Sequence, residues 1–129
     1  MYVIRKEFQA SCMHHLLGLP EDHPCGRVHG HNYVIVVELR SETLNKIGFV
    51  KDYGELNVIK EWIDKTMDHR ALNDVFSFNP TAENLAKHLY ERFVMLLGTD
   101  GMFLNAVEVS ETPKTNSRFY KTYNEHTTD

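Results

Sequence analysis

Two histidines separated by one glycine, His29 and His31, are the residues in this sequence best placed to do chemistry. Residues 32–39, which follow them, are rich in β-branched and aromatic types and predict a strand. Side chains two apart on a strand point to the same face, so both imidazoles project together, while Gly30 lets the backbone pack closely. The pair is either part of a metal site or two hydrogen-bonded surface histidines.

A third ligand is required for a catalytic zinc, which has three protein ligands and an open fourth position. His14 and His15 are the nearest candidates. A first strand is predicted over residues 1–14, and on a regular strand His14 shares its face with Ala10 and Cys12. This register makes His14 the expected ligand and leaves His15 as a solvent neighbour.

Composition describes an ordinary soluble domain that spans residues 1–129. Of these 129 residues, 42% are hydrophobic and 25% are charged, and the formal net charge is -4. A basic patch is missing, which excludes nucleic acid as the expected partner, and no apolar run approaches the roughly 20 residues of a membrane span. The N-terminus lacks the form of a signal peptide, so we expect a cytoplasmic protein in which Cys12 and Cys25 are thiols.

Hydrophobic spacing predicts two helices. The first begins after Asp52, whose side chain can cap the first turn. The second begins after Thr81, has Glu83 near the positive end of the helix dipole, and stops before Gly98. The apolar stripes of the two helices are Leu56, Ile59, Ile63 and Met67, and Leu85, Leu89, Phe93 and Leu96.

The remaining segments predict the strands. Main strands are expected over residues 1–14, 29–40, 105–111 and 117–123, with a short returning strand over 48–51 and a frayed tail over 124–129. Strands and helices come in runs, in the order ββααββ. This order favours an α+β fold in which a four-stranded antiparallel sheet carries two helices on one face.

Four further groups could take part in chemistry: the thiol of Cys25, the adjacent Asp68 and His69, and the carboxylate of Glu111 at a strand end. A thiol with a pKa near 8.5 becomes a useful base only where its surroundings favour the thiolate, as a metal or a histidinium would. Asp68 and His69 follow the first helix, where a histidine commonly meets the helix dipole. They are therefore either a helix end or a proton-transfer pair.

Taken together, these motifs resemble the 6-pyruvoyltetrahydropterin synthase family, in particular its bacterial 6-carboxytetrahydropterin synthase branch. The match covers nearly the whole chain, and no single motif carries it. The short spacing of three residues between Cys25 and His29 is similar to this branch rather than to the animal biopterin-pathway enzyme. The matching segments are His14 and residues 25–31, 48–53, 67–73, 79–84 and 111–113.

The resemblance implies the tunnelling fold, in which subunits join their sheets into a barrel, as a homohexamer of two trimers with active sites between subunits. It also implies a role for each candidate residue. These roles are zinc ligation by His14, His29 and His31, proton transfer by Cys25 and by Asp68 with His69, pterin anchoring by Glu111, and pocket lining by Thr81 and Glu83.

The reaction implied is that of a zinc-dependent carbon–oxygen lyase. It converts 7,8-dihydroneopterin triphosphate to 6-carboxy-5,6,7,8-tetrahydropterin, acetaldehyde and triphosphate, in queuosine (7-deazapurine) biosynthesis. Two alternatives stay open: a 6-pyruvoyltetrahydropterin product, and a non-catalytic pterin-binding protein. Candidates for binding triphosphate are Arg27, Lys114 and Arg118. Cys12 could compete for zinc, although a small buried thiol is its usual fate.

Overall fold

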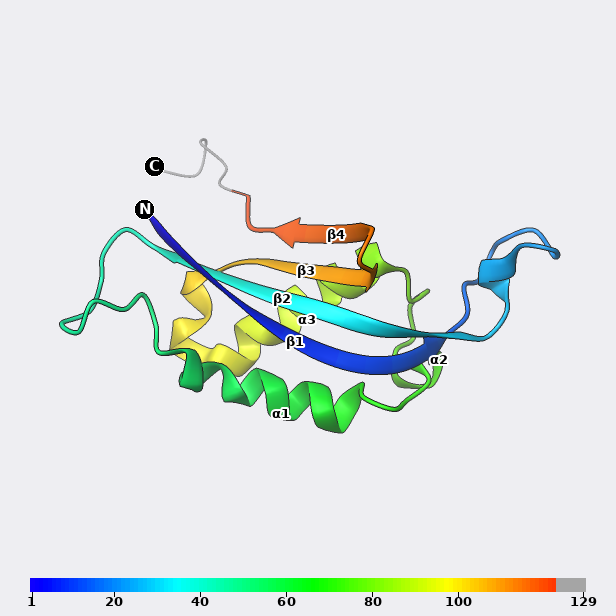
Figure 1. Ribbon diagram of the computed structural model, residues 1–129, viewed down its shortest axis with the longest axis horizontal. Coiled ribbons are helices and arrows are strands. Elements are labelled where there is room, and N and C mark those ends of the chain that lie inside the picture. The colour runs from blue at the N-terminus through cyan, green and yellow to red at the C-terminus, as the bar shows by residue number, and fades with distance from the viewer. Residues whose placement is uncertain (123–129) are drawn as a thin grey trace.

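Four strands form one antiparallel sheet in the order β1-β2-β3-β4 in the computed structural model, which describes residues 1–122. The strands are β1 (Tyr2–His14), β2 (His29–Ser41), β3 (Leu104–Thr112) and β4 (Thr115–Tyr120). Figure 1 shows them as a single twisted layer. The predicted α+β class and four-stranded antiparallel sheet are confirmed.

Two longer helices cover one face of the sheet (Figure 1). They are α1 (Asn57–Thr66), which contacts β1, and α3 (Ala82–Leu97), which contacts β3 and β4. A third helix, α2 (Leu72–Val75), is a single turn that the sequence pattern did not predict. The order ββααββ therefore holds once this short turn is added between the two long helices.

The core lies between the sheet and these helices. Alternate residues of β1 and β2 face the helices, and Tyr33 and Ile35 are fully buried there. Both predicted apolar stripes point into this core, apart from the partly buried Leu96. The buried stripe residues are Leu56, Ile59, Ile63, Met67, Leu85, Leu89 and Phe93.

The pairing of β1 with β2 determines where the histidines lie. It runs from Tyr2 opposite Ser41 to His14 opposite His29, the last pair of the ladder. His14 lies on the face of the core residues and is 1% exposed, so the predicted register of the first strand is correct. The histidines therefore continue the core-facing side of the sheet to the end of the ladder.

One local prediction was wrong, and the predicted cap at Asp52 is confirmed on a 3-10 turn rather than on α1 itself. Residues 48–51 form an irregular, bent loop rather than a returning strand, because the Asn45 carboxamide oxygen accepts three successive backbone N–H groups, from Ile47 to Phe49. Asp52 caps a 3-10 turn over Tyr53–Leu56 through the amide of Gly54, and α1 begins only after that turn.

The last strand begins two residues earlier than predicted and ends at Tyr120. Tyr123 and the predicted tail over residues 124–129 lie outside the described residues. Within residues 1–122, no helix is long and apolar enough to span a membrane.

Thr81 caps α3 as predicted, because its hydroxyl accepts from the backbone N–H of Asn84 at 3.1 Å. Thr81→Ala removes this acceptor and should lower the free energy of unfolding by about 1 kcal/mol, measured by urea denaturation. Thr81→Ser keeps the hydroxyl and serves as the matched control. Equal stability of all three proteins would contradict the capping role.

Candidate functional site

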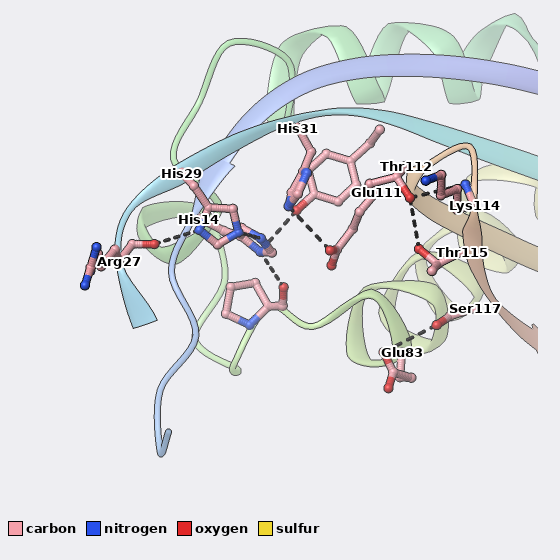
Figure 2. Close-up of polar contacts among 12 residues, drawn as sticks. His14, Arg27, His29, His31, Glu83, Glu111, Thr112, Lys114, Thr115 and Ser117 are labelled. Carbon is pink, nitrogen blue, oxygen red and sulfur yellow. Dashed lines mark hydrogen bonds and ion pairs between the residues drawn. The ribbon is translucent and has the colours of Figure 1, made fainter. Parts of the chain in front are cut away.

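Three imidazoles converge at the end of the β1–β2 ladder (Figure 2). His14 lies opposite His29 in the pairing, and His31 is two residues further along β2 on the same face. One nitrogen from each ring lies within 4.8 Å of the other two. Ligands about 2.0–2.1 Å from a tetrahedral metal ion lie about 3.4 Å from one another, so a small movement of these rings would bring them into range.

The outer nitrogens of two rings fix the tautomers. His14 Nδ1 donates to the carbonyl of Pro80 at 2.8 Å, and His29 Nδ1 donates to the carbonyl of Arg27 at 2.7 Å. A carbonyl can only accept, so both Nε2 atoms carry lone pairs, and they face each other at 2.9 Å. Two facing lone pairs repel each other, and a cation between them would relieve this repulsion. Outer hydrogen bonds of this kind are typical of metal-ligating histidines.

His31 completes the donor set. Its Nε2 is buried and has no hydrogen-bond partner among residues 1–122, and the nearest anionic atom is Oε2 of Glu111 at 3.4 Å. Burial lowers the pKa of His14, although its bond to Pro80 and the nearby Glu111 oppose this effect, so a neutral imidazole is favoured. Three imidazoles beside one carboxylate fit a divalent metal ion with an open coordination position.

Glu111 is directed at His31 by an irregularity in β3. The pairing of β3 with β4 shifts register between Val109 and Thr112, and Glu111 lies within this bulge. Bulges near active sites commonly redirect a side chain. Figure 2 shows Glu111 pointing toward His31 rather than along the strand.

Two surface hollows share His31. One, of about 540 Å³, is also lined by Glu111 and Pro113 of the β3 end and the β3–β4 turn. The other, of about 400 Å³, is lined by Ser11 and His69. Both volumes lie in the range of small-molecule sites. Glu111 and His69 therefore each line a hollow that His31 also lines.

Two contacts that support His14 in the candidate metal site were not predicted from the sequence. Tyr33 is fully buried, and its hydroxyl lies 3.1 Å from Nδ1 of His14. Residue spacing could have predicted this contact, because Tyr33 lies two residues beyond His31 on the same face of the strand. Residue spacing does not predict the contact of the Pro80 carbonyl with His14, because this contact depends on the tertiary fold.

Cys25 lies in a short 3-10 turn, Pro24–Gly26, within the loop that joins β1 to β2. The thiol is half-buried. The backbone N–H of Cys25 donates to Nδ1 of His23 at 3.1 Å, and its carbonyl accepts from the N–H of Leu16 at 2.8 Å. The main chain at Cys25 is thus held from both sides.

Asp68 and His69 lie along the outer edge of β1, away from β2. Oδ1 of Asp68 accepts from the Ser11 N–H at 2.8 Å, and Oδ2 lies 2.8 Å from Nδ1 of His69. These bonds hold the pKa of Asp68 below its usual value, and the bond from Ser11 has the largest effect. The ring of His69 is exposed, and its backbone has a φ of 61°, in the left-handed region that is common just after a helix. This geometry fits both predicted alternatives, a helix end and a proton-transfer pair.

Thr81 and Glu83 both have structural partners near the start of α3. Thr81 caps the helix, and Oε1 of Glu83 accepts from the Ser117 hydroxyl at 3.3 Å, which ties α3 to β4 (Figure 2). Their predicted contribution to a pocket stays a prediction.

The three basic candidates differ in their surroundings. Arg118 is bound to Glu38 at 2.5 Å and lies 3.5 Å from Glu108, so two carboxylates neutralise it. Arg27 and Lys114 are the better candidates for a phosphate, because they flank the histidines and Glu111 (Figure 2).

Cys12 is a buried thiol that donates to the carbonyl of Met67 at 3.1 Å. Burial, assisted by the charge of Asp68, raises its pKa to about 12. A thiol with so high a pKa stays protonated and does not compete with three imidazoles for a metal ion.

Comparison with known proteins places this geometry in a family. The model of the 6-pyruvoyl tetrahydropterin synthase family matches residues 3–122. A 6-carboxy-5,6,7,8-tetrahydropterin synthase from Rickettsia felis is 31% identical over 130 residues, which cover 84% of this chain and 91% of that protein. The solved structure of Caenorhabditis elegans 6-pyruvoyl tetrahydropterin synthase superposes with a TM-score of 0.83 at 27% identity, over 94% of this chain and 96% of that one.

The chain therefore belongs to the 6-pyruvoyl tetrahydropterin synthase family. The two relatives carry names for two different products, so membership alone does not assign the reaction.

The two thiols should differ sharply in reactivity. At pH 8 a thiol with a pKa of about 12 is thiolate in only about one molecule in ten thousand, so Cys12 should resist alkylation while the half-buried Cys25 reacts. Native protein treated with iodoacetamide should be labelled once per chain, and twice after unfolding, as measured by intact mass. Cys25→Ser should remove the native label, whereas two rapid native labels would contradict the protected state of Cys12.

Proposed function

We propose that this protein is a zinc-dependent 6-carboxy-5,6,7,8-tetrahydropterin synthase. Its substrate would be 7,8-dihydroneopterin triphosphate, and with one water the products would be 6-carboxytetrahydropterin, acetaldehyde and triphosphate, a step toward 7-deazapurines such as queuosine. The convergence of three imidazoles, two of which bond to backbone carbonyls through their outer nitrogens, is the observation that carries the proposal. The Rickettsia felis relative, which matches most of this chain, supports the choice of product.

His14, His29 and His31 would hold the zinc ion. Three histidines with an open fourth position are a common ligand set for catalytic zinc. Bound there, zinc would act as a Lewis acid on oxygen atoms of the pterin side chain and acidify the adjacent C–H bonds. The protein fixes the orientation of His14 and His29 through Pro80 and Arg27, so these ligands need little rearrangement.

Cys25 would take a proton from the side chain of the substrate. The turn holds its backbone at both the N–H and the C=O group, so the thiol is delivered from a fixed position. A thiol whose pKa is tuned toward the working pH is an effective general base.

Asp68 and His69 would supply a second proton-transfer group. The carboxylate bonds Nδ1 of His69, which leaves Nε2 as the nitrogen that faces solvent. This is the usual way in which a carboxylate orients a catalytic imidazole. His69 lines the same hollow as His31, so its ring lies beside the proposed metal centre.

Glu111 would anchor the pterin ring. Its carboxylate can accept hydrogen bonds from the amino and ring N–H groups of a pterin, and it lines the larger hollow with His31. The side chain is partly exposed, so a ligand can reach it.

The active site would be completed by a second subunit in a homohexamer. The side chain of His69 is 82% exposed at the outer edge of β1. Exposure of a strained, carboxylate-bonded histidine is consistent with a site that another copy of the chain covers.

A 6-pyruvoyltetrahydropterin synthase is the second candidate, supported by the similarity to the Caenorhabditis elegans enzyme. The same residues would serve both reactions up to the loss of triphosphate. The two products then differ by hydrolytic cleavage of one carbon–carbon bond, which releases acetaldehyde.

Metal binding should depend on the three histidines and on pH. Protein loaded with zinc should hold about one ion per chain, and His29→Ala should hold less than a tenth of that, measured by atomic emission. Protons compete for imidazoles below their ordinary pKa near 6.5, so zinc should be released as the pH falls through about 6 to 5. His88→Ala is the matched control, because His88 lies on α3 beside Phe76 and Phe78. Equal zinc content in His29→Ala would contradict the site.

Turnover should yield the 6-carboxy product. Zinc-loaded protein given 7,8-dihydroneopterin triphosphate should form 6-carboxytetrahydropterin and acetaldehyde in equal amounts, measured by mass spectrometry. Cys25→Ala should lower kcat by about 10²–10⁴-fold, the usual effect of losing a general base. Cys12→Ala is the matched thiol control and should stay within threefold.

A 6-pyruvoyl product without acetaldehyde would support the second candidate. Zinc-loaded protein that binds the pterin but never turns it over would be a pterin-binding protein, and full activity of Cys25→Ala would remove Cys25 from the mechanism.

A further inference from the structure

The outer edge of β1 is covered from Ser11 onward by residues 68–79, and the covering continues beyond the end of the strand. The N–H and C=O groups of odd-numbered residues point to this edge. Ser11 bonds Asp68 and the N–H of His69, and the N–H of Met13 bonds the carbonyl of Arg70 at 3.0 Å. The edge strand is therefore matched, residue by residue, to the segment that carries Asp68 and His69.

Two asparagine side chains continue this matching into the loop. Asn73 accepts from the N–H of His15 at 2.9 Å and donates to its carbonyl at 3.0 Å. Asn79 accepts from the N–H of Leu17 at 2.9 Å and donates to its carbonyl at 3.1 Å. Each carboxamide thus imitates a strand partner and fixes one residue through both backbone groups. We call these two contacts the amide clamp.

Leu16, between the two clamped residues, faces the other way. Its N–H donates to the carbonyl of Cys25 at 2.8 Å. Alternation along an extended chain requires this direction, because the neighbours on both sides point to the clamp. Cys25 is therefore attached to a residue whose position is set by Asn73 and Asn79.

We propose that Asn73 and Asn79 are positioning residues that hold the Cys25 loop in register with Asp68 and His69. Both asparagines belong to the same segment as the Asp68–His69 pair. The segment 68–79 thereby sets the positions of both proposed proton-transfer groups, His69 directly and Cys25 through Leu16. The clamp acts through Leu16 and does not need to contact the substrate.

This inference rests on the proposed function, in which Cys25 and His69 both transfer protons. Such transfer requires reacting atoms within about 3–3.5 Å, and a misplacement of about 1 Å can cost about 10²-fold in rate. Segments at a loop are the parts of a protein most able to drift by that amount. A clamp on both neighbours of Leu16 opposes this drift.

The test uses the full-length, zinc-loaded protein and the variants Asn73→Asp and Asn79→Asp. A carboxylate still accepts from the backbone N–H but cannot donate to the backbone carbonyl, and it repels that oxygen. Hydrogen–deuterium exchange should rise at least tenfold in peptides that contain Leu16 or Cys25. Peptides from the middle of β2 should keep wild-type exchange.

Kinetics separate positioning from general support of the fold. With 7,8-dihydroneopterin triphosphate, kcat should fall at least tenfold in each variant, while KM stays within twofold and zinc content is unchanged. Asn45→Asp is the matched control. Asn45 uses its side-chain oxygen to accept from the loop at residues 47–49, which an aspartate also does, so this variant should match wild type in exchange and kcat.

Each other outcome overturns the inference. Unchanged exchange at Leu16 would mean that the clamp does not hold the loop, and raised exchange with unchanged kcat would mean that the order of the loop does not matter for catalysis. Loss of zinc together with kcat would make the asparagines supports of the metal centre. The proposed function fails separately, if wild-type protein does not turn the pterin over. Exchange then decides alone whether the clamp exists.

Discussion

The antiparallel register of β1 on β2 is the constraint on which the rest of the site depends. It places His14 opposite His29 and Cys12 opposite His31, so three imidazoles meet where the strands end. Because side chains alternate along a strand, a slip of one residue would turn one strand's histidines to the other face. The register is in turn fixed by the core, since the same alternation buries Phe8 and Ile35 against the helices. The chemistry of the site is therefore specified by the packing of residues some distance from it.

Burial and hydrogen bonding act together on the imidazoles. Removing His14 from water disfavours its charged form, and the carbonyls behind His14 and His29 fix the proton on the outer nitrogen. Glu111 contributes negative charge without a short hydrogen bond to His31. The centre thus presents nitrogen donors and a nearby carboxylate, an arrangement that suits a divalent cation.

Much of this could be predicted from the sequence, and the reasons are local. Alternation identified the face of His14, and capping chemistry identified the start of α3 at Thr81. The turn at residues 48–51 was predicted as a strand because its residues suit one, whereas the Asn45 side chain, outside the pattern, decides the backbone. The contact of Pro80 with His14 could not be predicted, because it is made by a backbone carbonyl and not by a recognisable side chain. Features that depend on contacts between distant segments could not be predicted from residue spacing and secondary-structure propensity.

The outer edge of β1 also depends on contacts between distant segments. An exposed edge strand normally invites pairing with another chain, and here the segment after α1 occupies that edge from Ser11 onward. To follow the edge, the backbone at His69 adopts a φ of 61°, which costs a histidine about 1–3 kcal/mol. The cost is offset by bonds from Ser11 and by the Asp68 carboxylate on the ring of His69. The same segment thus covers the edge of β1 and holds the exposed ring of His69 in the hollow that His31 also lines.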